Sequence, residues 1–350
     1  MNFKTLKDAK IKDQIALVRV DYNVPLEKGK ITNDLRIRAS LPTISYLLDH
    51  DIKQIVLISH LGRPEGKVNS ELSLAPVARH LQKLLPDAKI DFHNLPKPSD
   101  QSLNKISNAK IVLLENLRFD PREEANDQSL MKEIIDFTKA DFCIQDGFAV
   151  SHRAHASISA LSQLLPTYLG LLFEKEIQNL DQVLKNPTRP LLFIIGGAKV
   201  ADKSLLIDKF LPLADKIAVG GKIAADGYAA KDNKIYIAED FDIDGEGNKL
   251  DIGPVSTAKI CELIEGAKTV VWNGLLGKAE DPAYSTASTI VADLLGQSHD
   301  KTTIICGGDT TGFVENRLAT HPELEYSLIS TGGGATLEYL LGNPLKIFTA

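Results

Sequence analysis

The sequence predicts an α/β protein of two domains, each built around a parallel β-sheet. Short apolar runs rich in β-branched residues recur along the chain, helical patterns separate several of them, and 350 residues are more than one ordinary core needs. Continuous apolar runs of this kind are typical of strands buried on both faces. The predicted strands cover residues 15–20, 54–59, 110–116, 141–146, 190–197, 215–221, 268–274, 302–309 and 326–334.

Helical patterns and a helix breaker set the predicted domain limits. Residues 74–85, 169–185 and 203–211 have helical periodicity. The apolar stripe of the second of these helices consists of Phe173, Ile177, Leu180 and Leu184. The segment NPTRP then breaks that helix before a new strand begins. We therefore expect a first domain over 1–168, a connecting helix over 169–185 and a second domain over 186–342.

Composition narrows the environment and the partners. Apolar residues make up 43% of the chain and charged residues 25%, and no run approaches the roughly 18 apolar residues of a membrane span. The first residues lack the apolar segment of a signal peptide, and Cys143, Cys261 and Cys306 have no disulfide or metal spacing. A net charge of −6 argues against nucleic-acid binding. We expect a cytoplasmic protein with neither a membrane nor a nucleic-acid partner.

Arginines follow the strands of the first half. Eight of the ten arginines precede residue 168, and ligands of open α/β sheets bind beyond the carboxyl ends of the strands. Arg63, Arg118 and Arg153 lie at or just past such ends, and the turn KGKITND brings Arg36 to the same edge. Because guanidinium groups match phosphate and carboxylate geometry, the pattern indicates a site for one small polyanion. The alternative is that these arginines are solvated loop charges or make surface ion pairs.

Three histidines lie in the same strand-end segments. His152 and His155 flank an arginine in HRAH, and His60 begins the segment HLGRP. The guanidinium inside HRAH would repel a zinc ion, and no cysteine or carboxylate completes a ligand set. We therefore favour hydrogen-bonding histidines over a metal site.

Glycine turns mark the second half. In GGAKVADK two glycines follow a strand, and Lys199 and Lys203 lie four residues apart on the helix that opens there. Two ammonium groups on one helix face repel each other and oppose the helix dipole, so a bound phosphate would relieve both penalties. Neutralisation by Asp202 or Asp208 is the alternative.

Two further turns repeat this pattern. CGGDT places Gly307, Gly308 and Asp309 between a strand and a helix, where backbone amides approach phosphate oxygens and a carboxylate binds Mg²⁺ carried in with them. Asp309 could instead be only an N-cap. STGGGA, with glycines at 332–334, is the third such turn. No G-x-x-x-x-G-K-[ST] or G-x-G-x-x-G motif is present in the sequence.

Taken in order, these motifs resemble one family over nearly the whole chain. RVDYNVP, RIRASLPTI, SHLGRP, LLENLRF, HRAHAS, GGAKVADK, VWNGLLG, GGDT and STGGGA occur in the order found in phosphoglycerate kinase. The resemblance implies two Rossmann-like domains joined by a helical hinge, with 3-phosphoglycerate on the first and the Mg-nucleotide on the second. It also implies that residues 343–350 pack back on the first domain, that the protein is a monomer, and that ADP/ATP with Mg²⁺ exchange a phosphoryl group with 1,3-bisphosphoglycerate.

The resemblance assigns site residues by position. Around 3-phosphoglycerate it places Asp21, Tyr22, Asn23, Arg36, His60, Leu61, Gly62, Arg63, Arg118 and Arg153. Around the nucleotide it places Gly197, Lys199, Lys203, Glu280, Gly307, Gly308, Asp309 and Thr310, with Asp309 on Mg²⁺ and Glu280 on the ribose hydroxyls. The catalytic set it implies is Arg36, Lys199, Gly308, Gly332 and Gly333. Phosphoryl transfer of this kind needs cations and amide donors but no protein nucleophile.

The chain departs from the family pattern at four positions and in length. Gln145 and Gly147 stand in QDGFA where NDAFG is usual, Leu275 replaces a proline, and Cys306 replaces a glycine. We predict that Cys306 keeps a negative φ, because a left-handed cysteine would cost on the order of 1 kcal/mol or more. The chain is also short for this family between Gly221 and Asp251, which leaves the base preference open.

Two other function classes remain in view. A binding protein on a catalytically impaired scaffold would be expected to lose Lys199, Arg36 or Asp309, and all three are present. A dinucleotide-dependent oxidoreductase would need an acidic residue roughly 20 positions after a G-x-G-x-x-G turn, which is missing.

Overall fold

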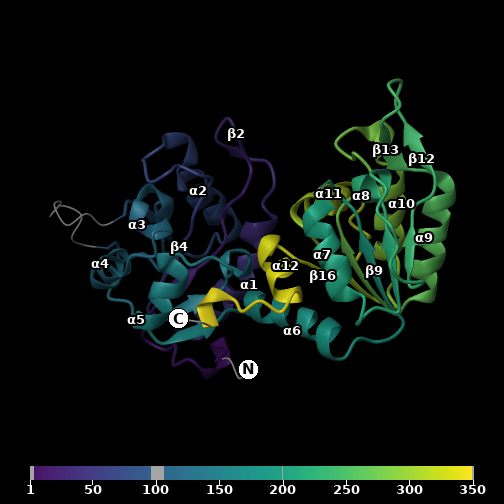
Figure 1. Cartoon of the computed structure of the whole chain (residues 1–350). Coiled ribbons are helices and arrows are strands. Elements are labelled where there is room, and N and C mark those ends of the chain that lie inside the picture. Colours follow the sequence, from purple (N-terminus) through teal and green to yellow (C-terminus); the bar gives the residue numbers. More distant parts are fainter. Residues whose placement is uncertain (1–3, 96–105, 199, 349–350) are drawn as a thin grey trace. The chain divides into compact units, whose positions relative to one another are not determined.

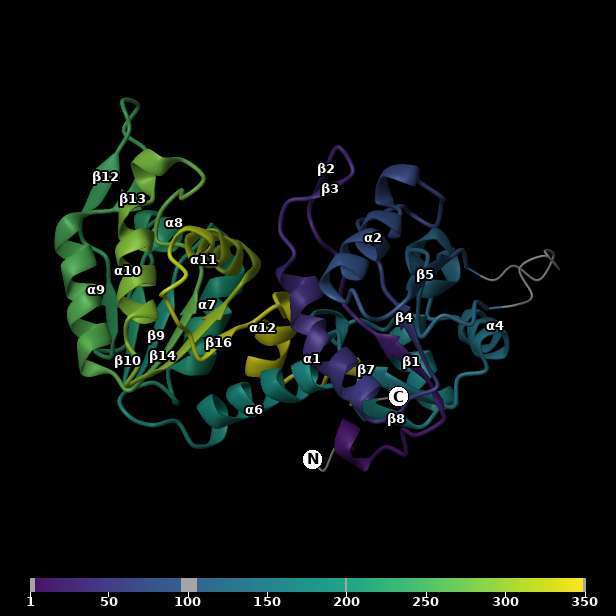
Figure 2. The ribbon, with the colours of Figure 1, turned by 180° about the vertical axis from the view of Figure 1, so that it is seen from behind.

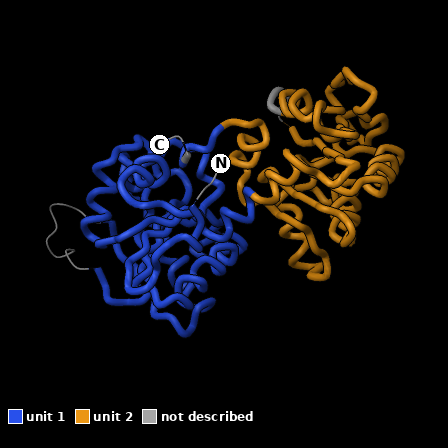
Figure 3. The backbone as a smooth tube through the Cα atoms, turned by 90° about the horizontal axis from the view of Figure 1, so that it is seen from below, with its two compact units in different colours: residues 1–177, 344–350 blue, residues 178–343 orange. Residues whose placement is uncertain are grey.

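The computed structural model describes residues 4–95, 106–198 and 200–348, and the chain divides into two compact units. Unit 1 consists of Met1–Ile177 and Pro344–Ala350, and unit 2 of Gln178–Asn343 (Figure 3). The division falls inside helix α6 (Leu171–Lys185). Among the described residues, no helix combines the length and the apolar character needed to cross a membrane.

Unit 1 is built on a six-stranded sheet in which all pairs are parallel. The strand order across the sheet is β5-β6-β4-β1-β7-β8. The strands are β1 (Ile15–Arg19), β4 (Gln54–Ile58), β5 (Ile90–His93), β6 (Ile111–Leu114), β7 (Phe142–Gln145) and β8 (Thr167–Leu169), and a short hairpin joins β2 (Leu26–Glu27) to β3 (Lys30–Ile31).

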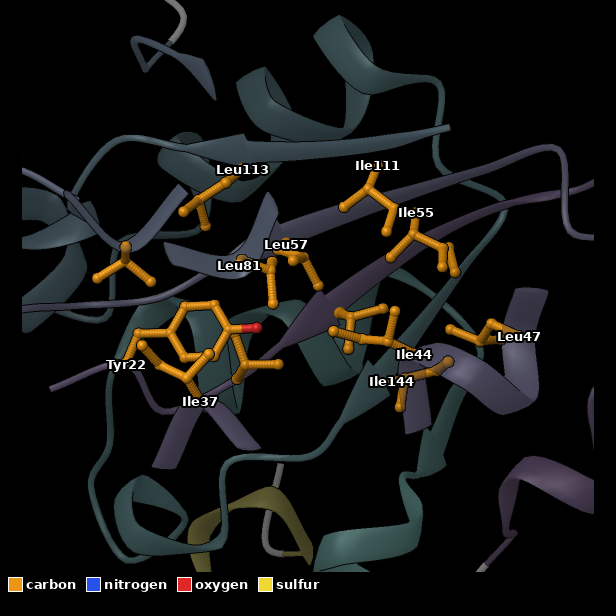
Figure 4. Packing of buried hydrophobic residues seen from close by; sticks show 14 of the residues in the cluster. Tyr22, Ile37, Ile44, Leu47, Ile55, Leu57, Leu81, Ile111, Leu113 and Ile144 are labelled. Carbon is orange, nitrogen blue, oxygen red and sulfur yellow. The ribbon is translucent and has the colours of Figure 1, made fainter. Parts of the chain in front are cut away.

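Alternate residues of these strands face two separate hydrophobic cores. Ala16 and Val18 of β1 belong to one cluster with Leu47 of helix α1 (Leu35–Asp49), whereas Ile15 and Leu17 belong to the other cluster. The strands are therefore apolar on both faces, which is why their sequences read as continuous apolar runs. Figure 4 shows the first cluster, in which Ile37, Ile44 and Leu47 of α1 and Leu81 of helix α2 (Ala75–Leu84) pack against labelled residues of β4, β6 and β7.

Helices and single turns cover both faces of this sheet. Helix α4 is capped by Asp127, whose side chain accepts a hydrogen bond from Ser129 N, and α3 combines an Asp120 cap with Pro121 at its first position. The helical elements of unit 1 are η1 (Leu6–Asp8), α1 (Leu35–Asp49), η2 (Ser70–Leu72), α2 (Ala75–Leu84), η4 (Leu117–Phe119), α3 (Pro121–Glu124), α4 (Gln128–Thr138), η5 (Phe148–Val150), the π-helical η6 (Ala156–Ala160), α5 (Leu161–Leu164) and η8 (Lys346–Phe348).

Unit 2 repeats the same architecture with a second parallel sheet. Its strand order is β11-β10-β9-β14-β15-β16, and an antiparallel hairpin of β12 and β13 is attached outside this sheet. The strands are β9 (Leu191–Ile195), β10 (Lys216–Val219), β11 (Ile235–Ile237), β12 (Phe241–Ile243), β13 (Lys249–Ile252), β14 (Thr269–Asn273), β15 (Thr302–Cys306) and β16 (Leu328–Ile329).

The helices of unit 2 follow its strands in alternation. They are α7 (Val200–Phe210), α8 (Gly221–Ala225), α9 (Pro254–Gly266), η7 (Pro282–Tyr284), α10 (Thr286–Gly296), α11 (Gly308–Thr320) and α12 (Gly334–Leu340). Figures 1 and 2 show α9 and α10 side by side along one part of the unit, with the β12–β13 hairpin beyond them.

The predicted α/β fold with two parallel sheets is confirmed. Each of the nine predicted strands is present, as β1, β4, β6, β7, β9, β10, β14, β15 and β16. The strands β5, β8 and β11 that complete the two sheets were not predicted. Strand β5 (IDFH) carries charged or polar residues at alternate positions and is only partly buried, so it lacks the apolar run that marks a central strand.

Candidate active site

The residues predicted to bind an anion in unit 1 follow four adjacent parallel strands. β6, β4, β1 and β7 are neighbours in the sheet, so their carboxyl ends share one edge. The segments that leave these ends are residues 115–119, 59–64, 20–25 and 146–157. The predicted side chains therefore start from a common edge of one sheet.

Asp21 connects the segment after β1 to the start of α1. Its side chain is almost fully buried and accepts hydrogen bonds from the Arg36 guanidinium and, at 3.2 Å, from Asn23 N. The Oδ1 atom of Asn23 accepts from Gly62 N at 2.9 Å. Arg36 is the second residue of α1, and 32% of its side chain is exposed. Asp21 thus orients an arginine that remains accessible to solvent.

Arg118 is buried at the end of β6. Its Nη1 donates to Gly62 O at 2.7 Å, and its Nε lies 3.0 Å from Glu124 Oε1 without the alignment of a hydrogen bond. Burial lowers the pKa of Arg118, and the positive charges of Arg153 and Arg63 lower it further against the opposing charge of Glu124. Three of the predicted arginines therefore lie close enough to repel one another.

His60 is a buried, neutral histidine within the same group of arginines. Burial holds its pKa well below the ordinary value, and the charges of Arg19, Arg118, Arg153 and Arg36 add to the effect. Its Nδ1 lies 3.3 Å from Arg19 Nη2. Because a guanidinium can only donate, Nδ1 accepts and the ring proton is on Nε2. The contacts of His60 agree with the predicted hydrogen-bonding histidine.

Arg19 is a functional candidate that the sequence analysis did not select. It is fully buried, its Nε donates to Ser157 Oγ at 2.8 Å, and it also donates to Val20 O. Glu123, also fully buried, accepts from Ser157 Oγ at 2.6 Å and from Ser157 N at 3.0 Å. Burial raises the pKa of Glu123, which the charge of Arg19 opposes. A charged last residue in an apolar strand was the signal that could have identified Arg19.

Arg153 and His155 complete the cluster from the segment after β7. Arg153 is half-buried, and its Nε lies 3.5 Å from His152 Nε2. The pKa of His155 falls to about 4, chiefly through burial and then through the charges of Arg118 and Arg153. The five guanidinium groups of the cluster, whose charges act on His60 or Arg118, are those of Arg19, Arg36, Arg63, Arg118 and Arg153. We call this set the arginine cluster.

Tyr22 and Leu61 lie in the core. Tyr22 is fully buried, its hydroxyl is 3.0 Å from Ser40 Oγ, and Figure 4 shows its ring among the core side chains. Leu61 belongs to the same hydrophobic cluster, and its N donates to Asn116 Oδ1 at 3.1 Å. Both residues follow strands of the site edge, but their side chains point into the core. Only their backbone lies in the segments that carry the arginine cluster.

The departures from the family pattern in unit 1 are accommodated next to Arg19. Gln145 Nε2 donates to Ser157 O at 2.8 Å, so its side chain braces the segment that binds Arg19. Gly147 N donates to Arg19 O at 2.8 Å. An added Cβ at Gly147 would lie 3.4 Å from Asp21 N, an ordinary contact, so packing does not demand glycine there.

In unit 2 the glycines after β9 and β14 pack backbone against backbone. Gly197 has a φ of +90° and donates from N to Leu275 O at 2.7 Å. A Cβ on Gly274 would lie 2.1 Å from Gly196 O. These glycines are needed for internal contact, and the Gly197 amide predicted to bind nucleotide is already engaged by Leu275. The replacement of proline by leucine at 275 leaves this carbonyl contact in place.

Lys203 is held by the end of β14. Its Nζ donates to Asn273 O at 3.3 Å and also contacts Asn273 Oδ1. Asn273, which the sequence analysis did not select, donates from Nδ2 to Cys306 Sγ at 3.3 Å. Cys306 closes β15 with an extended backbone, and the positive φ of 94° falls on Gly307, so the prediction for Cys306 is confirmed. Lys199 lies outside the described residues.

The turn after β15 leads directly into α11. Gly307 is the N-cap, so Asp309 lies in the first helical turn and is not the cap, which removes the alternative considered for it. Thr310 is buried, and its Oγ1 accepts from Gly274 N at 2.8 Å. At Gly308 an added Cβ would meet no described atom within 4 Å, and its φ is not positive. Neither packing nor backbone conformation explains this glycine.

A cavity of about 730 Å³ lies among these turns within unit 2. Three of the predicted nucleotide residues, Gly197, Glu280 and Asp309, line it. Its walls also carry residues that were not predicted to bind nucleotide, from the segments after β9 and β14, from α8 and from the β12–β13 hairpin. These are Ala198, Lys222, Ala225, Asp226, Gly247, Asn248, Lys249, Leu250, Leu275, Gly277 and Lys278.

The predicted triple-glycine turn separates β16 from α12. Gly333 has a φ of +49° and precedes α12, which begins at Gly334 and is seven residues long. Gly332 N donates to Ser330 Oγ at 3.1 Å, and Thr311 Oγ1 of α11 donates to Ser330 O at 3.2 Å. None of Gly332, Gly333 and Gly334 is among the described residues that line the cavity. The turn shares the sheet edge with the cavity walls but lies outside the cavity.

Asp309, in the turn after β15, is the candidate Mg²⁺ ligand, and Asp226 and Glu280 also line the cavity. The described residues contain no cluster of three or more histidine, cysteine or carboxylate groups suited to a metal. Mg²⁺ usually takes one or two carboxylates, with waters and substrate phosphates as its other ligands. One exposed carboxylate at the wall of a cavity fits that donor set.

Comparisons with known proteins agree along the whole chain. A family model described as phosphoglycerate kinase matches residues 6–240 and 225–343. The phosphoglycerate kinase of Moorella thermoacetica is 38% identical over 387 residues, covering 97% of this chain and 97% of that protein. That of Roseiflexus sp. is 37% identical and covers 98% of this chain and 97% of that protein.

Solved structures give the same result. The structure of phosphoglycerate kinase from Coxiella burnetii matches with a TM-score of 0.80 and 30% identity, covering 99% of this chain and 98% of that one. The enzyme from Pyrococcus horikoshii OT3 matches with a TM-score of 0.83 and the same coverage, and at 24% identity it supports the fold alone. The resemblance seen in the nine ordered motifs is confirmed, and the chain belongs to the phosphoglycerate kinase family, whose members are phosphotransferases.

Proposed function

We propose how the chain divides the phosphoryl transfer between 1,3-bisphosphoglycerate and ADP, which yields 3-phosphoglycerate and ATP. Residues 1–168 with the tail 343–350 bind the glycerate substrate, residues 186–342 bind the Mg-nucleotide, and the helix over 169–185 joins the two. The observation that carries this division is the arginine cluster of unit 1, in which the charges of four guanidinium groups act on the neutral His60 and that of Arg63 acts on Arg118.

The arginine cluster supports a polyanionic substrate. Arg118 is 5% exposed and Arg19 is fully buried, and burying like charges together is unfavourable without counter-charge. The described acidic partners are Asp21, Glu123 and Glu124, which leave a surplus of positive charge. A phosphate and a carboxylate on one small molecule would supply the missing charge. Asp21 and Asn23 then hold the glycerate end, and Arg36, Arg63, Arg118 and Arg153, with His60, bind its anionic groups.

The cavity of unit 2 supports a nucleotide. Glu280 at the wall of the cavity is suited to accept hydrogen bonds from ribose hydroxyls. Lys203, whose Nζ donates to Asn273 O, is suited to bind a phosphate. Gly308 adds backbone that an approaching phosphate can reach, because no described side chain or backbone atom fills the space beside it. Lys199 is assigned to the transferred phosphoryl group from the motif GGAKVADK.

Mg²⁺ would be held by Asp309 and would supply neutralisation of the phosphate charge. The surrounding residues of the chain do the remaining work by orienting the phosphates and donating hydrogen bonds. Because charge in such a transition state spreads over the phosphoryl oxygens, pre-placed cations and amides suffice and no protein nucleophile is needed. We further propose that ADP and ATP are the nucleotides, and that the protein acts as a monomer in the cytoplasm.

The test is an assay of acyl-phosphate formation from 3-phosphoglycerate and Mg-ATP. We expect turnover by the unaltered protein and a rate at least about 10²-fold lower in Arg36→Ala and Lys199→Ala, since each removes a cation that contacts the transferred group. Lys268→Ala is the matched control, because this exposed lysine pairs with Asp300 on the surface of unit 2 and should leave the rate unchanged.

The Mg²⁺ dependence tests the role of Asp309 in the same assay. Asp309→Asn is expected to raise the Mg²⁺ concentration needed for half-maximal rate by about tenfold, because one anionic ligand is lost. No turnover by the unaltered protein with any nucleotide would favour the impaired binding protein instead. A preference for GDP over ADP in nucleotide titration would overturn the assignment of the base.

A further inference from the structure

We infer that Asp251 is a positioning residue for the nucleotide cavity: its buried carboxylate fixes two of the cavity walls relative to each other. This inference rests on the proposed function, since it takes the cavity of unit 2 as the nucleotide site. The two walls are the β12–β13 hairpin, which contributes Gly247 to Leu250, and the segment after β14, which contributes Leu275, Gly277, Lys278 and Glu280.

The Asp251 carboxylate is satisfied by backbone amides rather than by a cation. The residue is 2% exposed, and it makes no ion pair with any described residue. Its Oδ1 accepts from Ile252 N at 3.0 Å, and its Oδ2 accepts from Ala287 N at 3.1 Å. Ala287 is the second residue of α10, whose N-cap Ser285 shows no side-chain capping bond among the described residues. Asp251 therefore caps α10 from a neighbouring strand.

The wall that carries Glu280 is packed directly on this carboxylate. A Cβ added to Gly277 would lie 2.3 Å from Asp251 Oδ1 and 2.4 Å from Tyr284 O, so no larger residue fits there without movement. One residue later, Lys278 N donates to Leu250 O at 2.7 Å. The segment is thus registered against β13 at two consecutive positions. Glu280 follows two residues beyond this clamp.

Asp240 provides an internal control beside β12, the other strand of the same hairpin. Its carboxylate accepts from Val255 N at 2.9 Å and from Ser256 N at 2.7 Å, and so caps α9. A Cβ on Gly253 would lie 2.2 Å from Asp240 Oδ2, which repeats the relation between Gly277 and Asp251. Neither Asp240 nor Gly253 is among the described cavity residues. The two aspartates share their chemistry, but only Asp251 supports the cavity.

The fold shifts the pKa values of the two aspartates in opposite directions. Burial raises the pKa of Asp251 to about 6, and the negative charge of Asp242 adds to this. For Asp240, burial is outweighed by hydrogen bonds from Ser256 and its pKa is lowered. Ionised Asp251 is therefore kept in the fold at a cost, whereas ionised Asp240 stabilises the fold. Neutralising Asp240 should therefore lower the stability of the protein, whereas neutralising Asp251 should change the binding of Mg-ATP.

The experiment compares Asp251→Asn with Asp240→Asn in the full-length protein, measuring both substrate KM values, kcat and Tm at pH 8. For Asp251→Asn we expect a KM for Mg-ATP raised about tenfold, because an amide cannot accept the bonds of both carboxylate oxygens. We expect kcat and the KM for 3-phosphoglycerate to stay near the unaltered values. For Asp240→Asn we expect a lower Tm and unchanged KM values.

A second variant approaches the same contact from the other side. Gly277→Ala leaves the carboxylate in place and displaces the segment, so it should raise the KM for Mg-ATP in the same selective way. An unchanged KM for Mg-ATP in either variant, or an equal rise in both substrate KM values, would overturn the inference. If Asp309→Asn also leaves Mg-nucleotide use unchanged, the proposed function fails instead, and the two failures are thereby distinguished.

Discussion

The two units differ in the groups that they place at the carboxyl edge of their sheets. Unit 1 uses side chains, and two of its arginines, Arg19 and Arg118, are buried among other cations. Unit 2 uses strand-to-helix turns in which glycine brings the backbone close, as at Gly308 before Asp309. Both devices stand at the carboxyl edge of a parallel sheet. The same architecture thus presents full charges in one unit and mainly amide dipoles in the other.

The difference teaches where each unit is vulnerable. Cationic side chains held close together repel one another until an anion binds. The anion affinity of a site like that of unit 1 should therefore depend on each cation and on ionic strength. The backbone amides of a helix turn are already oriented by the fold. The affinity of a site like that of unit 2 should therefore depend on whether a ligand can reach the backbone. Substitutions in the two units should therefore impair the protein in different ways, and variants of each unit test this.

The largest expected effect comes from removing one cation of the arginine cluster. Arg118→Met keeps the length of the side chain and removes its charge. We expect kcat/KM for 3-phosphoglycerate to fall about 10²-fold or more, because two or more charge-assisted hydrogen bonds are lost. The KM for Mg-ATP should not change. Initial-rate kinetics with each substrate varied in turn will measure both.

Arg122→Met is the matched control for that variant. Arg122 lies four residues away, and its ion pairs are with Asp120 and Glu133, each at 2.8 Å. It should lower Tm without a large change in kcat/KM. Equal losses of kcat/KM in both variants would show that the arginine cluster acts through the fold rather than through substrate binding.

A smaller effect is expected from two glycines of unit 2. Gly308→Ala should raise the KM for Mg-ATP about tenfold while stabilising α11 by about 0.5–1 kcal/mol, since alanine favours helix and meets no described atom. Gly274→Ala should instead destabilise by about 2–4 kcal/mol, because its φ is +101° and its Cβ would lie 2.1 Å from Gly196 O. Calorimetric Tm and nucleotide kinetics separate the two. A Gly308→Ala enzyme with unaltered kinetics would contradict the role assigned to that backbone.

The smallest expected effect concerns a buried carboxylate of unit 1. Asp146 Oδ1 accepts from Thr43 Oγ1 at 2.8 Å and from Leu172 N of α6 at 3.1 Å, and Oδ2 has no partner among the described residues. Burial raises its pKa from 3.8 to about 7. The folded state thus binds a proton that the unfolded state releases, and the stability so gained is lost as pH rises through about 7.

Asp146→Asn should remove this pH dependence. At pH 8 the variant should be more stable than the unaltered protein by on the order of 1 kcal/mol, and the difference should shrink at pH 5, where Asp146 is protonated. Calorimetry at both values measures it. A variant less stable at pH 8 than at pH 5, relative to the unaltered protein, would show that the ionised carboxylate is favoured in the fold.

Sequence patterns predicted the central strands and the sheet edge that carries the candidate site residues. The runs that became β1, β4, β9 and β14 are apolar on both faces, and such a pattern is local to the run. The predicted arginines follow β1, β4, β6 and β7, so a polyanion site at that edge could be predicted before any contact was known. The edge strand β5 was missed, because a half-exposed strand carries a weaker pattern.

The contacts of several candidate site residues could not be predicted, because their partners are distant in the chain. Arg19 is defined by Ser157, which is 138 positions away, and Asn273 by Lys203, which is 70 positions away. Tyr22 stands in a motif beside Asp21, yet packing directs its ring into the core. The role of Lys199 stays a prediction from its motif.

By itself the sequence determined the nine predicted strands, the residue types placed after each of them, and the family resemblance, because each depends on residues close together in the chain. The tertiary structure alone decided which charges are buried, which amides are already engaged, and which aspartate supports the cavity. Burial and hydrogen bonding join residues that are far apart in the chain, and their free energies depend on the packing around them.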